Sequence, residues 1–163
     1  MLRGWLALAS VYLCLSCLLG VTSPKPPGCT KPLLLEKVNG FIEIANNTSF
    51  NCSLYTPSNE DVKQKCPRSS LQCFAAEVEV LFVEWHINNV PGADKFRLHK
   101  KLEGEADLIK PTTESGCRHC EVFEMKQPLM FLEDLQRTLQ WMNARYCDPT
   151  PRKLLSKHPF SSS

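Results

Sequence analysis

Cysteine is the residue type in this chain whose spacing most clearly suggests chemistry. The sequence has 163 residues, and nine of them are cysteine. Cys66 and Cys73 are seven residues apart, whereas Cys117 and Cys120 enclose His119 in a Cys-x-x-Cys step. Such a step can bind zinc, exchange thiols with disulfides, or form structural disulfides with more distant cysteines. Which of these applies depends on the rest of the sequence.

Zinc binding and redox catalysis both fit the sequence poorly. Structural zinc sites usually combine two closely spaced ligand pairs, and Cys66 and Cys73 are too far apart for that spacing. A thioredoxin-like motif lies where a strand enters a helix, and the sequence has almost no strand pattern. The four histidines show no ligand or triad spacing, and no nucleophile elbow, paired-carboxylate frame or phosphate loop is present. We therefore expect no metal, no cofactor and no enzymatic activity.

The first 23 residues predict a secretory signal peptide. Arg3 precedes an apolar run from Leu6 to Leu19, and small residues follow at 20–23. The run is shorter than the roughly 20 apolar residues that span a bilayer, so we expect cleavage and no membrane insertion of the mature chain. Secretion brings the other seven cysteines into an oxidising compartment, which favours disulfides. The mature protein is therefore expected to be extracellular.

Three glycosylation sequons crowd into eight residues of the sequence. Their acceptors are Asn46, Asn47 and Asn51. A sequon is used only where the segment is translocated and exposed. Because the sequons follow a signal peptide, we expect a glycoprotein that carries a glycan on at least one of them.

Length and charge balance indicate one small domain that does not bind nucleic acid. The formal net charge is only +2, from 19 basic and 17 acidic residues, whereas a nucleic-acid-binding protein needs a clear basic excess. The length suits one compact domain with short flanking segments. We predict a signal peptide at 1–23, one domain at 24–147, a flexible C-terminal tail at 148–163, and a monomer.

Apolar residues recur at helical spacing in four segments, and the alternation typical of strands is almost absent. The predicted helices cover residues 32–46, 70–90, 93–109 and 127–146, with Ser70 as the N-cap of the second. A coiled-coil-like seam in the fourth segment comprises Met125, Pro128, Leu132, Leu135, Leu139, Met142 and Tyr146. The pattern predicts an all-α protein.

The connections between these helices predict the topology. Residues 48–69 and 110–127 are long connections, whereas residues 88–92 form a short turn. A long, a short and a long connection, in that order, are typical of an up-up-down-down four-helix bundle with two crossovers, as in helical cytokines and growth hormones. Cys66 and Cys73 lie at and just beyond the end of the first connection, and Cys117 and Cys120 lie in the second, so we favour disulfides between the two pairs, each closing a loop of roughly 50 residues and stabilising the fold by about 4 kcal/mol. Spacing alone does not choose the partners.

The second predicted helix carries a candidate binding surface. Val80 and Val83 project away from its core face, and Glu77 and Glu84 flank Val80. An exposed apolar spot with an acidic rim is typical of a surface that binds a basic partner.

The fourth predicted helix carries a second candidate binding surface. Met130, Arg137 and Trp141 form a stripe that lies off its core seam. An exposed tryptophan is a candidate for a dominant interface contact.

Several stretches of the sequence resemble the interleukin-15 family of cytokines. They are Leu54-Tyr55-Thr56, Cys73-Phe74 with Glu77, residues 113–121 (TESGCRHCE), and Gln140-Trp141-Met142-Asn143. The segment with the Cys-x-x-Cys step is the most specific of these. The resemblance covers roughly residues 33–143, except the third predicted helix.

The resemblance implies a short-chain four-helix cytokine with disulfides Cys66–Cys117 and Cys73–Cys120. It also implies a ligand of three receptor ectodomains, the alpha, beta and common gamma chains, that stimulates T and NK lymphocytes. The contacts carried over to the alpha chain are Tyr55, Glu77, Val80, Glu84 and Glu121. The contact carried over to the common gamma chain is Gln140, to which the helix stripe adds Trp141. Lys37 stands where the family has an acidic beta-chain contact.

One further expectation concerns the cysteines that the resemblance does not cover. In the predicted topology the start of the first helix and the end of the fourth lie at the same end of the bundle. Cys29 and Cys147 could therefore form a disulfide that joins the termini, which would leave Cys52 as the remaining cysteine.

The alternative to a cytokine is a secreted disulfide-rich binding or inhibitory protein without a signalling role. A metal- or thiol-dependent enzyme is a third interpretation, which zinc and free-thiol analysis would separate from the other two.

Overall fold

The computed structural model describes residues 30, 32–49, 51–64, 66–92, 97–110 and 114–147. Within these residues the chain forms four main helices, one short helix, one 3-10 helix and a two-stranded sheet. In chain order the elements are α2 (Pro32–Asn47), β1 (Leu54–Thr56), α3 (Asn59–Gln64), α4 (Pro67–Ile87), α5 (Leu98–Asp107), η3 (Cys120–Val122), β2 (Glu124–Lys126) and α6 (Pro128–Tyr146).

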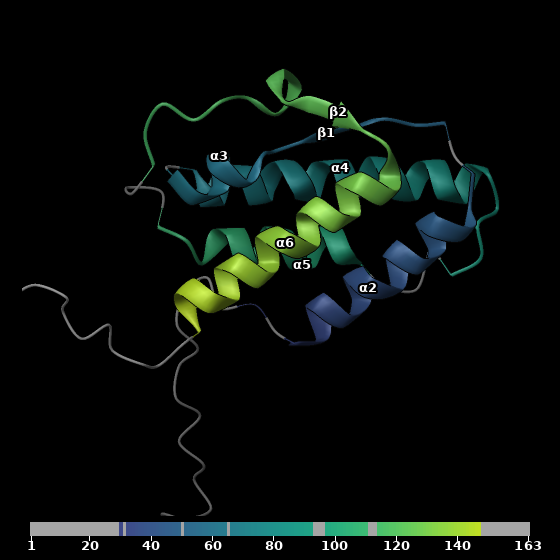
Figure 1. The fold of residues 1–163 in the computed structure, drawn as a ribbon, viewed down its shortest axis with the longest axis horizontal. Coiled ribbons are helices and arrows are strands. Elements are labelled where there is room, and N and C mark those ends of the chain that lie inside the picture. The colour runs from purple at the N-terminus through teal and green to yellow at the C-terminus, as the bar shows by residue number, and fades with distance from the viewer. Residues whose placement is uncertain are drawn as a thin grey trace, which may run out of the picture.

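The four main helices form an up-up-down-down bundle (Figure 1). α2 and α4 run in one direction, and α5 and α6 run in the opposite direction. α2 packs mainly against α6, and α4 mainly against α5. Residues 48–66, the first crossover, carry β1 and α3, and residues 108–127, the second crossover, carry η3 and β2. The predicted short-chain four-helix bundle with two long crossovers is confirmed.

The core is built from the apolar stripe of each main helix. On α4, Phe74, Val78 and Leu81 are fully buried, and Trp85 extends the stripe by one turn. Gaps of three and four residues place these side chains on one face of the helix. Phe74 contacts Phe131 of α6, with ring centroids 5.4 Å apart. Burial of each large apolar side chain stabilises the fold by ~1.5–3 kcal/mol, so this stripe accounts for much of the packing of α4.

α6 buries most of the predicted seam. Its fully buried members are Leu132, Leu135, Leu139 and Met142. Met125, however, lies in β2 and is 53% exposed. The prediction extended the seam too far because Pro128, which has no N–H to donate, begins the helix and ends the helical spacing there.

α4 begins three residues earlier than predicted. Its first residue is Pro67, and Ser70, the predicted N-cap, is buried inside the helix. Proline suits a first helical turn because its N–H would have no partner there. The Glu114 carboxylate, from the second crossover, accepts hydrogen bonds from the backbone N–H groups of Arg68 and Ser69, and from the Ser69 hydroxyl at 2.6 Å. A side chain distant in sequence therefore caps this helix.

β1 and β2 form a short antiparallel sheet, which the sequence pattern did not indicate. The register pairs Tyr55 with Met125 at the centre of the sheet. Each strand has three residues, which is too short for a visible alternation of apolar and polar side chains. The sheet instead joins the first crossover to the second, two segments that are far apart in the sequence.

α5 is shorter than the predicted helix at 93–109. It starts at Leu98, because the backbone of Arg97 is not helical, and it ends at Asp107. Beyond the end, the Ile109 N–H donates to the Ala106 carbonyl in a tighter turn. Residues 93–96 lie outside the described residues. The connection from α4 to α5 is consequently longer than the short turn predicted at 88–92.

Each main helix has one buried and one exposed face. Among the described helices, none combines the length and the apolar composition needed to cross a membrane.

The capping role of Glu114 is testable. Glu114→Ala should lower the free energy of unfolding by about 1–2 kcal/mol, because N–H groups at the start of α4 lose their acceptor. Glu114→Gln should cost less, since an amide oxygen still accepts hydrogen bonds. Chemical denaturation measures both. Glu79→Gln, an exposed change on the same helix, is the control and should shift the value by less than about 0.5 kcal/mol. A Glu114→Ala variant as stable as this control would contradict the capping role.

Candidate functional site

Two disulfides attach the second crossover to the N-terminal half of α4. Cys66, just before the helix, bonds to Cys117, and their Cα atoms are 5.7 Å apart. Cys73, two turns into the helix, bonds to Cys120, with Cα atoms 5.3 Å apart. These are the pairs that the family resemblance implies. As disulfides, these four cysteines offer no thiolate for zinc or for thiol exchange.

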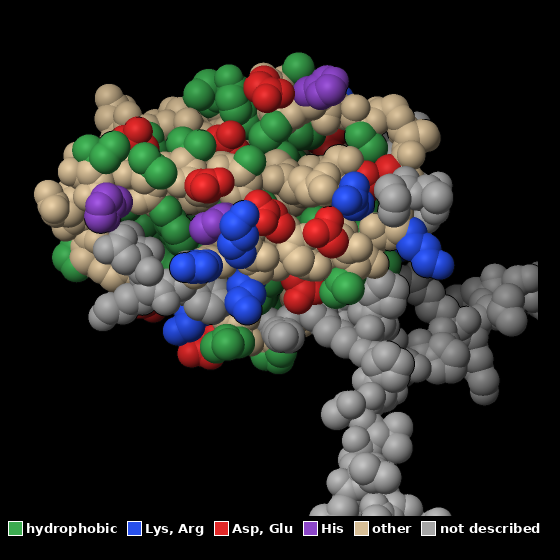
Figure 2. All heavy atoms as spheres, turned by 180° about the vertical axis from the view of Figure 1, so that it is seen from behind, with side chains coloured by type: hydrophobic (Ala, Val, Ile, Leu, Met, Phe, Trp, Pro, Cys, Tyr) green, Lys and Arg blue, Asp and Glu red, His purple; other side chains and the backbone are tan. Residues whose placement is uncertain are grey.

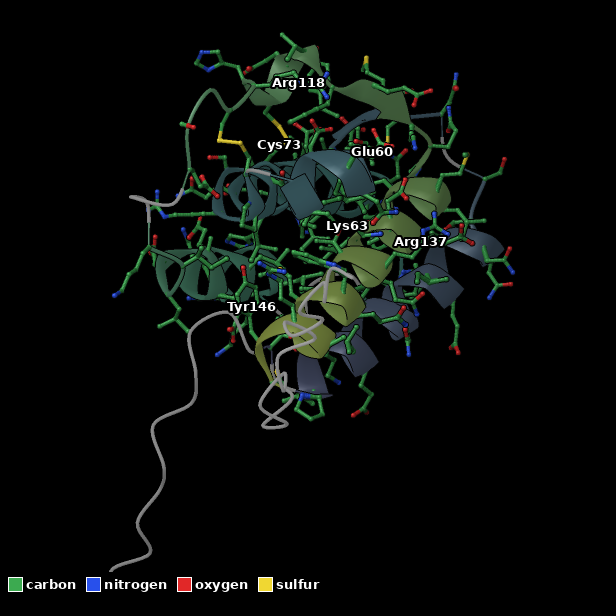
Figure 3. The ribbon with its side chains drawn as sticks, turned by 60° about the vertical axis from the view of Figure 1, so that its left-hand side comes forward. Glu60, Lys63, Cys73, Arg118, Arg137 and Tyr146 are labelled. Atoms are coloured by element: carbon green, nitrogen blue, oxygen red, sulfur yellow. A yellow bond between two sulfur atoms is a disulfide. The ribbon has the colours of Figure 1, made fainter. Side chains whose placement is uncertain are left out.

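An ion pair holds the two crossovers together beside these disulfides. The Arg118 guanidinium donates to the Asp61 carboxylate of α3 and lies 5.1 Å from the ring centroid of Phe123. Although burial raises the pKa of Asp61, hydrogen bonds from Ser58 and Arg118 hold it below its usual range. Figure 3 shows Arg118 in the second crossover on the same side of the molecule as Cys73. The crossovers are therefore joined by covalent, ionic and strand contacts.

This arrangement brings together three of the predicted alpha-chain contacts. The Tyr55 backbone N–H in β1 donates to Glu77 Oε2 in α4 at 3.0 Å. Burial raises the pKa of Glu77, the negative charge of Glu121 in η3 raises it further, and the Tyr55 hydrogen bond opposes both effects. Two carboxylates that repel each other are thus held near one backbone donor.

The other two predicted alpha-chain contacts continue along α4. Val80 is 47% exposed, and Glu84 follows one turn later and is half-buried. Cys52, half-buried against the core, lies near Glu84, since burial and then the Glu84 charge raise the pKa of Cys52. Figure 2 shows hydrophobic and acidic side chains interspersed over the upper part of the face seen from behind. All five predicted residues therefore belong to one region built from β1, α4 and η3.

Several apolar side chains of this region were not predicted. Val83 on α4 was expected to be exposed and is 53% exposed, whereas Ile87, one turn further and 65% exposed, was not expected there. Met125 pairs with Tyr55 in the sheet, and Val122 is exposed next to Glu121. Ile87 lies at helical spacing from Val80 and could have been found by extending the stripe. Met125 could not, because its apparent helical spacing assigned it to the core.

The end of α6 differs from the sequence-based expectation. Gln140 is exposed, but Trp141 is only half-exposed and packs against the edge of the core. Its ring makes an edge contact with Tyr146 at 6.3 Å, and Arg145 lies 5.5 Å from the Trp141 ring centroid. The prediction treated Trp141 as an exposed side chain because it lies off the seam, and it could not foresee cover from Tyr146.

The stripe that Met130, Arg137 and Trp141 were expected to form is partly engaged in ion pairs. Met130 is exposed, and Arg137 donates to the buried Asp134 at 2.8 Å. Asp134 also accepts from Lys126 of β2 at 3.0 Å. The start of α6 is therefore tied to the sheet, and Arg137 has a structural partner.

The two ends of the described region meet beside α6. The Thr30 backbone N–H donates to Asn143 Oδ1 at 2.8 Å. Asn143 lies four residues before Cys147 in the sequence. Cys147 is disulfide-bonded. Cys29 lies outside the described residues, so the Cys29–Cys147 bond stays a prediction.

The three sequon asparagines lie around the end of α2. Asn46, Asn47 and Asn51 are all exposed, and the Asn47 side-chain amide donates to the Glu43 carbonyl at 2.9 Å. Glycosylation of these residues stays a prediction. Among the described residues, no group of three histidine, cysteine or acidic side chains is arranged to hold a metal ion.

Comparison with known proteins identifies the same family as the sequence resemblance. A sequence model of the family described as Interleukin 15 matches residues 10–143, which is most of the chain. The interleukin-15 proteins of Ailuropoda melanoleuca, Marmota himalayana and Marmota monax are each 28% identical to this chain over 109 residues. The aligned stretch covers 65% of this chain but only 62% of each relative, so the chain spans less than two thirds of their length. Because the family match covers well over half of the sequence, the chain belongs to the interleukin 15 family, whose members are cytokines and not enzymes.

Proposed function

We propose that this protein is a secreted cytokine that is bound by an alpha receptor chain and stimulates T and NK lymphocytes through beta and common gamma chains. Family membership supports the class of protein. The observation that carries the proposal is the convergence of Tyr55, Glu77 and Glu121 from three segments. A secreted ligand needs such a surface to recognise a receptor. Glu77 also accepts the Tyr55 N–H, but the second carboxylate, Glu121, makes the charge on Glu77 less favourable.

The alpha-chain site is proposed to be the region formed by Tyr55, Glu77, Val80, Glu84 and Glu121. Its centre is the exposed Val80 on α4, and carboxylates stand on both sides of it. An apolar centre with a charged rim is the usual anatomy of a specific interface. The acidic rim selects a partner with arginine or lysine side chains.

The signalling chains are proposed to bind elsewhere on the bundle. Gln140, exposed on α6, and the adjacent Trp141 are the proposed common gamma contacts. On α2, the exposed Lys37 stands where the family has an acidic beta-chain contact. If Lys37 prevented binding of the beta chain, the protein would bind the alpha chain without signalling, which is the inhibitory alternative. Stimulation of lymphocytes by the wild-type protein decides between the two.

Secretion is proposed to follow cleavage of the signal peptide at 1–23, leaving the domain at 24–147 and the tail at 148–163. Two disulfides in the structure support an oxidising compartment. The three exposed sequon asparagines are compatible with N-glycosylation.

Reversing the charge of the acidic rim should abolish recognition by the alpha chain. The double change Glu77→Lys with Glu84→Lys should weaken binding by several kcal/mol, because two attractive charge pairs become repulsive. Surface plasmon resonance with the alpha ectodomain measures the effect, and circular dichroism checks the fold. The matched control is Glu79→Lys with Glu103→Lys, two exposed or half-exposed acidic residues outside the site. Equal affinity of the two double variants would refute the proposed site.

The raised pKa of Glu77 predicts a pH dependence of the same interaction. Acidification should protonate Glu77 before ordinary carboxyl groups, and alpha-chain affinity should then fall several-fold at a pH above the one at which ordinary carboxyl groups titrate. Folding stability should respond in the opposite direction. A carboxyl group with a raised pKa binds protons more tightly in the folded state, so its contribution to stability increases as the pH falls through that pKa.

A Glu77→Gln variant tests this prediction. It should bind more weakly at neutral pH and lose less affinity on acidification than the wild type, whereas Glu79→Gln should follow the wild-type curve. A Glu77→Gln curve parallel to that of the wild type would show that another group causes the pH dependence.

A substitution at Gln140 tests whether alpha-chain binding and signalling use different surfaces of the protein. Gln140→Asp should leave the fold and alpha-chain binding unchanged, because the side chain is exposed and lies outside the alpha site. An unpaired carboxylate buried against the common gamma chain should reduce signalling about tenfold or more. The readout is proliferation of responding lymphocytes, and Gln72→Asp on the exposed side of α4 is the control. Full signalling by Gln140→Asp would remove this residue from the receptor surface.

A further inference from the structure

α5 has an exposed basic face near its start. Arg97, Lys100 and Lys101 are exposed, and spacings of three and four residues place them on one side of the helix. His99 beside them is half-exposed. In Figure 1 α5 lies behind α6, and Figure 2, seen from behind, shows several Lys and Arg side chains below the middle of the face, with a histidine and acidic side chains beside them. In the sequence Lys95 adds another cation just before this group, although it lies outside the described residues.

Three acidic residues, Glu103, Glu105 and Asp107, follow this basic face on α5, and Glu103 pairs with it. Lys100 pairs with Glu103 at 3.0 Å, and both side chains are largely exposed to solvent. Within the described residues, Arg97 and Lys101 form no ion pair. The net charge of the whole chain is only +2, so the basic face is a local concentration of charge and not a consequence of a basic protein.

The order of charges along α5 is unfavourable for the helix itself. Its first turn holds no acidic residue and its last turn no basic one, and Arg97 at the N-cap makes no side-chain capping bond. Cations near the N-terminus of a helix and anions near its C-terminus oppose the helix dipole, each at a cost of about 0.3–1 kcal/mol. Folding therefore does not explain this arrangement, whereas binding of an anionic partner does.

The chemistry of the face favours a sulfated polysaccharide over a protein. Protein interfaces depend on a buried apolar or aromatic anchor, and no large hydrophobic side chain from 97–107 is exposed. Leu108, the nearest exposed one in sequence, follows at the far end of the helix. A cluster of cations without an apolar centre suits a polyanion, which is bound by release of its counterions. Dense basic stretches of five to eight residues are typical of heparin-binding patches.

We propose that the Arg97, Lys100 and Lys101 face of α5 binds sulfated glycosaminoglycans of the extracellular matrix. None of its residues belongs to the proposed receptor contacts. The face would retain the secreted protein on cell surfaces and matrix independently of its receptors. Its affinity depends on sulfate groups and falls steeply with salt.

Heparin binding by the full secreted protein tests the proposal without any receptor. Arg97→Gln with Lys101→Gln should lower the affinity for immobilised heparin about tenfold and reduce the slope of log affinity against log salt by about 1.4–1.8. Lys63→Gln with Arg145→Gln removes one lysine and one arginine elsewhere and should retain wild-type affinity to within about twofold. Desulfated heparin is the ligand control and should not bind. Thermal unfolding verifies that both double variants are folded.

Three outcomes would overturn the proposal. Equal losses of heparin affinity in the two double variants would show a dependence on net charge alone. Equal binding of desulfated heparin would exclude recognition of sulfate. Unchanged heparin binding by the α5 double variant, together with lost binding to the beta ectodomain, would assign the face to an acidic protein partner. Each of these results leaves the alpha-chain proposal intact, because that site does not include α5.

Discussion

The two disulfides that attach the second crossover to the N-terminal half of α4 are the constraint on which the rest of this structure depends. The bonded cysteines are 51 and 47 residues apart in the sequence, so each bond removes a large loop entropy from the unfolded chain, worth about 4 kcal/mol in the chain-entropy model. Among its described residues, the second crossover has only three-residue elements of its own, η3 and β2. Once the bonds anchor it to α4, Glu114 reaches the helix start, Arg118 reaches Asp61, and β2 pairs with β1. The apolar core fixes the arrangement of the four main helices, and the disulfides fix the second crossover on α4.

The surface around Glu77 contains an unfavourable electrostatic interaction that the fold tolerates. Glu77 and Glu121 repel each other, and burial disfavours the charge on Glu77 further. A fold selected only for stability would remove one of the carboxylates or supply a cation to them. The Tyr55 N–H offsets only part of the cost. A charge arrangement that opposes stability but persists at an exposed apolar spot is best understood as preparation for a partner, since a cation from outside would relieve both effects.

The parts of the fold that could be predicted are those determined by local pattern. The buried stripe of α4 and the seam of α6 follow from helical spacing, because each residue's burial depends on its own position in the repeat. The parts that were missed depend on contacts over long sequence distances. Ser70 was a reasonable N-cap until Glu114 provided the cap from another segment. Met125 had helical spacing but lies in a strand that exists only beside β1, and Trp141 lies off the seam yet packs against Tyr146. For the candidate site, the resemblance supplied the residues, whereas the structure supplied the reason that three segments meet.

Two exposed surfaces of opposite charge lie on neighbouring helices of this protein, although the total charge is close to zero. The α4 surface around Val80 carries Glu77 and Glu84, whereas the exposed face at the start of α5 carries Arg97, Lys100 and Lys101. α4 and α5 pack against each other in the bundle, so oppositely charged surfaces belong to neighbouring helices. On α5 the Lys100–Glu103 ion pair is one contact at a spacing of three residues, but the cations still stand at the helix start and the anions towards its end, against the helix dipole. The physical consequence is two exposed surfaces of opposite charge. A cation-rich partner approaching α4 and a polyanion approaching α5 are each steered by the nearer field, because solvent ions screen the other beyond roughly 8–10 Å.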